Sequence, residues 1–160
     1  EEAKAKKDIL KNLNSKLTQL KLLSQEQPKK EGNIKSIEDQ LLKALTKIND
    51  SYSTDEKRVQ FDYINNNFSQ IQSNFNYFKE STVDKLVNLH IENLTEDNPS
   101  LVIQILKNLV KFFYYLSRIF NIDDINTILR LIVTHYSSRN NSIVTMCNQL
   151  IEIIRKKCMV

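Results

Sequence analysis

The sequence contains a single glycine, Gly32, among 160 residues, and only two prolines, Pro28 and Pro99. Glycine adopts positive φ at no steric cost, so tight β-hairpins, glycine-rich phosphate loops and the strained turn of a nucleophile elbow depend on it. A chain with one glycine lacks the residues for these structures. Because 41% of its residues are hydrophobic, it can still bury a core. We therefore predict an all-α fold of about seven antiparallel helices.

Residues 1–80 are predicted to form an N-terminal array of helical hairpins. Leucines spaced three and four residues apart predict a first helix over about residues 3–25. This helix is expected to end at Pro28, because the residue before a proline is disfavoured in the helical region. A second helix is expected over about residues 34–49, and a third begins at an N-cap at Thr54.

The third helix carries the most regular apolar pattern in the sequence. Its large apolar side chains follow a strict alternation of three and four residues, which is typical of a helix packed along another long helix. They are Phe61, Ile64, Phe68, Ile71, Phe75 and Phe78. We interpret this heptad-like seam as core, with an interface for a partner through Phe61, Phe68, Phe75 and Phe78 as the alternative.

Residues 81–160 are predicted to form a compact, right-handed four-helix bundle. Ser81 is expected to cap its first helix, and Asn98 its second, with Pro99 at the first helical position, where its missing N–H costs nothing. The helix over about residues 99–120 is apolar around most of its circumference and is therefore expected to be the central one. Asp123 or Asp124 is expected to cap the third helix, and residues 143–154 lie in the fourth.

Charge is distributed unevenly along the chain, although the net charge is only +4. Residues 1–50 carry 11 basic and 8 acidic side chains, residues 51–100 carry 4 and 8, and residues 101–160 carry 8 and 3. Two basic clusters, around residues 4–11 and 155–157, are interpreted as solvated helix faces. They are too sparse to favour nucleic acid as the partner, and no apolar stretch approaches the length of a membrane span.

Titratable residues suited to catalysis or metal binding are few. His90 and His135 are the only imidazoles, and neither has a second metal ligand four residues away. We expect His90 to be half-buried and His135 to lie at a helix end. Cys147 and Cys158 are too far apart on one helix to form a disulfide, which favours a reducing, intracellular compartment. We expect no enzyme activity, no cofactor and no metal site.

The C-terminal half resembles a family of helical domains on the following residues. They are the loop and helix start at residues 94–101, then Ile105, Leu106, Leu109, Ile128, Leu129 and Ile132, and a last helix with Ile143, Met146, Cys147, Leu150, Ile151 and Ile154 before Arg155 and Lys156. Over these residues the chain is similar to the N-terminal domain of transcription elongation factor S-II and to the integrase-binding domain of lens-epithelium-derived growth factor.

This resemblance implies a protein–protein interaction domain of a nuclear transcription or chromatin factor. Domains of the family capture short, disordered acidic and aromatic motifs with their inter-helix loops. In the integrase-binding branch, an acidic residue of the first loop accepts hydrogen bonds from partner N–H groups, and the matching position in this chain is Asp97, beside Asn98. Glu96 stands at the preceding position, where that branch has an aliphatic residue. The second contact loop is polar here, at Ser138 and Arg139, and Arg139 suits an acidic peptide.

A second function remains open at this point. Helical repeats of the HEAT kind produce similar spacing, so the chain is alternatively a structural scaffold or a coiled-coil assembly subunit. The partner is then a helix rather than a disordered peptide. Glu1-Glu2-Ala3-Lys4 lacks an initiator methionine and an apolar signal, so we expect further domains beside this one. The pattern of apolar residues leaves open the oligomeric state and what residues 1–80 pack against.

Overall fold

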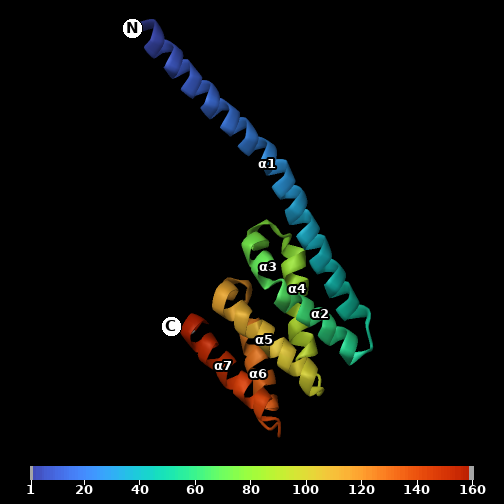
Figure 1. Ribbon diagram of the computed structural model, residues 1–160. Coiled ribbons are helices and arrows are strands. Elements are labelled where there is room, and N and C mark those ends of the chain that lie inside the picture. Colours follow the sequence, from blue (N-terminus) through green and yellow to red (C-terminus); the bar gives the residue numbers. More distant parts are fainter. Residues whose placement is uncertain (1, 159–160) are drawn as a thin grey trace. The chain divides into compact units, whose positions relative to one another are not determined.

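The computed structural model describes residues 2–158, with side chains placed for residues 5–17 and 35–158 (Figure 1). Over the described residues it contains seven α-helices and two short 3-10 helices, and no strand. The predicted all-α class is therefore confirmed. No described residue has a positive φ, Gly32 included, so this fold is built without the conformations that glycine uniquely allows.

Helix α1 runs from Glu2 to Asp50 without interruption. The expected end at Pro28 and the loop after it are therefore wrong, and the first two predicted helices form one. Proline inside a helix removes one hydrogen bond and strains one turn, at a cost of about 3 kcal/mol. Because every further residue adds a hydrogen bond once a helix exists, long helical segments on both sides can offset that cost.

The chain divides into two compact units, one ending at Ser36 and the other beginning at Ile37. In the first unit, Ile9, Leu10, Leu13 and Leu17 are all at least half exposed. In the second, residues 37–50 of α1 contribute core side chains. These are Leu41, Ala44, Leu45 and Ile48, each at most 4% exposed.

Helix α2 (Thr54–Asn66) and helix α3 (Phe68–Asn74) replace the single helix predicted here, and a 3-10 turn, η1 (Phe75–Tyr77), follows. The N-cap of α2 is Ser53, whose hydroxyl accepts a hydrogen bond from the Glu56 N–H, and not Thr54. The break falls at Asn67, whose side-chain amide donates to the Tyr63 carbonyl at 2.8 Å. Asparagine competes with the helix for its own backbone groups, which explains a break inside a regular apolar pattern.

The heptad-like seam nevertheless packs inside the molecule. Phe61, Phe68 and Phe78 are buried in the core, and Phe75 is partly buried against it. The Phe68 ring lies 5.6 Å from the Phe112 ring. Residues of the N-terminal half thus share one core with the C-terminal half, while independent folding of residues 81–160 as a separate domain stays a prediction.

Helix α4 (Glu80–Asn93) is capped from a distant part of the chain. Its N-cap position is Lys79, and the backbone N–H of Lys79 donates to the Glu38 carboxylate at 2.7 Å. The prediction that Ser81 caps this helix is therefore wrong. A carboxylate at a helix N-terminus is favoured by the helix dipole, and Glu38 supplies it from α1.

Helix α5 (Pro99–Leu116) is the central element, as predicted, and packs against α2, α4 and α7. The predicted cap is confirmed, because the Asn98 side chain accepts from the Leu101 N–H at 3.2 Å. The helix ends earlier than expected, at a 3-10 turn, η2 (Ser117–Ile119). Near this end Tyr114 and Tyr115 remain about half exposed.

Helices α6 (Ile122–His135) and α7 (Asn141–Cys158) complete the bundle. The N-cap of α6 is Asn121, and not Asp123 or Asp124. The Asn121 side chain accepts from the Asp124 N–H, and the Asp124 carboxylate accepts in return from the Asn121 N–H. The expected acidic residue is thus present, but as the second member of a capping box.

Candidate protein-interaction site

Two inter-helix loops lie next to each other in the folded chain. The first, loop A, comprises residues 94–98 between α4 and α5, and the second, loop B, comprises residues 136–140 between α6 and α7. His135 Nε2 lies 2.5 Å from the Leu94 carbonyl oxygen. Because a carbonyl only accepts, Nε2 carries the proton and donates it. This contact joins the end of α6 to the start of loop A, so the two loops that carry the residues predicted to bind a partner begin next to each other.

Loop A carries two carboxylates, of which one forms an ion pair and the other has no side-chain partner among the described residues. Glu96 pairs with Lys57 of α2 at 3.5 Å, and Asn98 is engaged in capping α5. Asp97 is exposed, and among the described residues no side chain bonds to its carboxylate. Of the three residues predicted in this loop, Asp97 is thus the one available to a ligand.

Loop B likewise contains side chains that stabilise the loop and one charged side chain without an ion-pair partner among the described residues. The Ser138 hydroxyl accepts from the Asn140 N–H at 3.2 Å and stabilises the turn. The Tyr136 hydroxyl donates to Asn148 on α7 and so fixes the start of the loop. Arg139 is exposed and makes no ion pair with any described residue. The surface therefore offers a carboxylate and a guanidinium, which match the N–H groups and the acidic side chains of a peptide.

His90 lies away from this surface, in the core. It is completely buried rather than half-buried as predicted, and its ring packs edge-on against Phe61 and Phe112. Its Nδ1–H donates to the Leu86 carbonyl at 2.7 Å, and Nε2 accepts from the Asn108 side-chain amide at 3.1 Å. Burial lowers the pKa of His90 to about 4, although the Leu86 hydrogen bond opposes this shift. The ring is a neutral structural element.

Both cysteines lie in surroundings that disfavour the thiolate. Cys147 is fully buried, and burial raises its pKa to about 11. Burial also raises the pKa of Cys158, despite three basic neighbours in the sequence. Because the thiolate is the nucleophilic form, neither environment favours nucleophilic chemistry.

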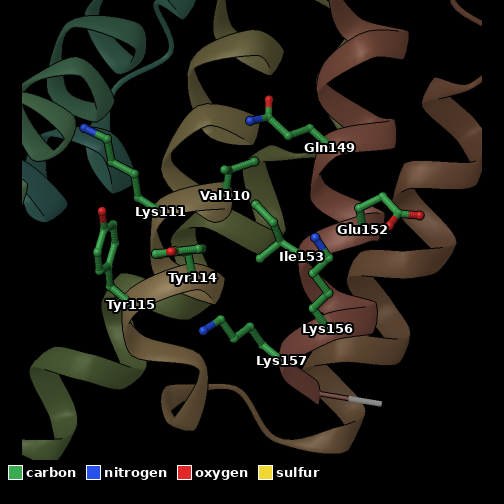
Figure 2. A pocket seen from close by; sticks show the side chains of 9 residues that line it. All are labelled: Val110, Lys111, Tyr114, Tyr115, Gln149, Glu152, Ile153, Lys156 and Lys157. Atoms are coloured by element: carbon green, nitrogen blue, oxygen red, sulfur yellow. The ribbon is translucent and has the colours of Figure 1, made fainter. Parts of the chain in front are cut away.

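A groove between α5 and α7 is the second surface feature of this unit, and sequence analysis did not identify it (Figure 2). Its volume is about 440 Å³. Val110 and Tyr114 from α5 face Ile153 and Lys157 from α7. Its lining residues are Val110, Lys111, Tyr114, Tyr115, Gln149, Glu152, Ile153, Lys156 and Lys157.

A signal for this groove was present in the sequence. Tyr114 and Tyr115 lie three and four residues after Lys111 in a largely apolar helix, so both are neighbours of Lys111 on the helix surface. The prediction for this helix was based only on its apolar residues and included none of these three. Lysine and tyrosine keep their polar atoms in water while their apolar parts cover the protein surface. Their positions therefore mark the edge of the buried face of the helix.

Two features are absent from the described residues. No three His, Cys, Asp or Glu side chains among them are grouped so that they could hold a metal ion. No helix in the same part of the chain is both long and apolar enough to cross a membrane.

Comparisons with known proteins found no matching family model, no matching curated protein and no matching solved structure. The family resemblance therefore stays a prediction.

Proposed function

We propose that this chain is a non-catalytic protein-interaction domain that captures a short, disordered acidic and aromatic motif with loops A and B. In this proposal Asp97 accepts hydrogen bonds from backbone N–H groups of the motif, and Arg139 pairs with one of its carboxylates. A transcription or chromatin factor in the nucleus is the setting that the family resemblance implies.

The hydrogen bond from His135 to Leu94 is the observation that carries this proposal. It joins the ends of α4 and α6, and so brings together two loops that are about 40 residues apart in sequence. Each loop has one exposed charged side chain with no partner among the described residues, while its neighbours serve the fold. Charged groups arranged in this way contribute to specificity and to the association rate.

The test is a titration of the isotope-labelled chain with short acidic-aromatic peptides, followed by amide NMR. We expect chemical-shift changes at residues 95–100 and 137–142. Asp97→Lys and Arg139→Glu should each weaken binding about tenfold, because each reverses a charge at the contact. Asp39→Lys is the matched control, since Asp39 is an exposed carboxylate on α1.

Unchanged affinity of the Asp97→Lys variant for a peptide that binds would refute the role of loop A. Shifts confined to other residues would refute the site as a whole. Both variants alter exposed side chains that have no hydrogen-bond partner among the described residues, so their thermal melts should match that of the unmodified chain.

A scaffold role is the second candidate, and a different observation favours it. Ile9, Leu10, Leu13 and Leu17 lie at helical spacing and are half exposed or more, as in a helix that pairs with another helix. Light scattering in dilute solution tests self-assembly directly. A mass above that of one chain, lost in a Leu10→Asp/Leu17→Asp double variant, supports this role, and a monomer at all concentrations contradicts self-assembly through this face.

A further inference from the structure

The groove between α5 and α7 combines an apolar floor with a positively charged rim. Val110 and Ile153 form apolar parts of its lining, and Tyr114 and Tyr115 are 51% and 53% exposed. Three lysines line it against one glutamate, Glu152. Such a surface suits a ligand that has both an apolar side chain and negative charge.

The positive charge at the rim is largely uncompensated by the chain itself. Within the described residues, Lys156 and Lys157 have no ion-pair partner, whereas Glu152 already pairs with Arg155 at 3.6 Å. Lys157 Nζ lies 4.7 Å from the centre of the Tyr114 ring, which holds this charge over the groove. Lys111 is differently placed, since it donates to the Asn65 carbonyl at 3.4 Å.

The tyrosines are arranged unfavourably for stacking nucleic-acid bases. Lys157 covers one face of Tyr114, and Tyr115 packs against both Tyr114 and Phe68, with ring centres 4.7 Å and 5.6 Å apart. Single-stranded nucleic acid requires open aromatic faces beside a continuous basic track. These features favour a peptide over a nucleic acid.

We infer that the groove between α5 and α7 is a docking site for an acidic peptide segment. An aliphatic or aromatic side chain of that segment lies between Val110 and Ile153, and flanking carboxylates meet Lys156 and Lys157. This site is separate from loops A and B, because the loops precede the first turns of α5 and α7 while the groove lies along their last turns. About 16 residues, or roughly 24 Å of helix, separate Asn98 from Tyr114.

The experiment uses the full chain and a fluorescein-labelled peptide of aspartates with one leucine and one phenylalanine, measured by fluorescence anisotropy. A Lys156→Glu/Lys157→Glu double variant should weaken binding about tenfold or more. Tyr114→Ala, which leaves the charges in place, should weaken it by a smaller factor. Lys85→Glu changes an exposed lysine on α4 outside the groove and should leave binding unchanged.

Further controls separate the possible ligands and sites. A peptide with asparagine in place of aspartate should not bind. Because the loop site would bind the same class of peptide, the groove is tested in the Asp97→Lys background: the peptide should still bind there, and the loss caused by Lys156→Glu/Lys157→Glu should persist. Equal losses in the double variant and Lys85→Glu would overturn the proposal. No binding, preferential binding of an oligothymidine strand, or occupation of the groove by a second copy of the chain would also overturn it.

Discussion

Two stretches of helix α1 carry the same apolar pattern and have opposite surroundings. In residues 5–17, Leu10, Leu13 and Leu17 recur at three- and four-residue spacing and are 51–60% exposed. In residues 37–48, Leu41, Ala44, Leu45 and Ile48 recur in the same way and are at most 4% exposed. The periodicity identifies an apolar face in both stretches, but it does not specify which other element covers that face.

The difference shows what the second stretch gains from its tertiary contacts. Burying one leucine or isoleucine side chain contributes about 1.5–3 kcal/mol, and Leu41, Leu45 and Ile48 make this contribution three times within one core. Over residues 5–17 the leucines remain at least half exposed and gain correspondingly less. We therefore expect the two stretches to differ sharply in their effect on stability, and the following predictions test that difference.

The largest effect is expected from truncation. A chain starting at residue 37 should unfold cooperatively, with a melting temperature within a few degrees of the full chain, because its core is complete. A chain starting at residue 54 loses the buried side chains of α1 and the Glu38 carboxylate at α4, which together approach the total stability of about 5–15 kcal/mol typical of domains. Circular dichroism during heating measures both. Similar melting of the two truncated chains would contradict the comparison.

Single leucine substitutions sharpen the same comparison. Leu45→Ala removes a side chain that is 1% exposed and should destabilise the chain by about 2–5 kcal/mol. Leu13→Ala is the matched variant at a position that is 52% exposed, and surface substitutions usually change stability by less than about 0.5 kcal/mol. Urea titration measures both changes. Comparable losses in the two variants would show that residues 5–17 are covered in solution.

The sequence was sufficient to predict the helical class, the central position of α5 and the Asn98 cap. Each of these follows from local information, namely a scarce residue type, an apolar circumference, or an asparagine just before a proline. The cap of α4 could not be predicted, because Glu38 reaches Lys79 across 41 positions of sequence. The exposed loop residues were predicted individually, but the contact of His135 with Leu94 that joins the loops depends on tertiary packing.

The burial of His90 predicts that the stability of the fold depends on pH. Because the pKa of His90 falls from 6.5 to about 4 on folding, the unfolded chain binds a proton between these values that the folded chain excludes. The contribution of neutral His90 to the free energy of unfolding is therefore complete above pH 6.5 and is lost as the pH falls toward 4. The loss amounts to about 3 kcal/mol, at 1.36 kcal/mol per pKa unit. Urea midpoints measured across this range should decrease on acidification.

The control for this prediction is His90→Gln, which retains a hydrogen-bonding side chain without an imidazole charge. This variant is expected to be less stable at neutral pH, because it disturbs the bonds to Leu86 and Asn108. Its stability should depend less on pH between 4 and 6.5 than that of the unmodified chain. Equal slopes in the two chains would show that carboxylates, and not His90, determine the acid sensitivity.

The smallest effect is expected at the ion pair between Lys57 and Glu96, which lies between the two extremes of burial. Its side chains are 16% and 36% exposed, and pairs with this much solvent contact contribute about 0.2–1 kcal/mol. Glu96→Gln should lower stability by an amount within that range, and by less in high salt, since ions screen exposed charges. Asp97→Asn, at the neighbouring unpaired carboxylate, should leave stability unchanged. A larger loss for Asp97→Asn than for Glu96→Gln would mean that Asp97 serves the fold, and would remove it from the proposed binding surface.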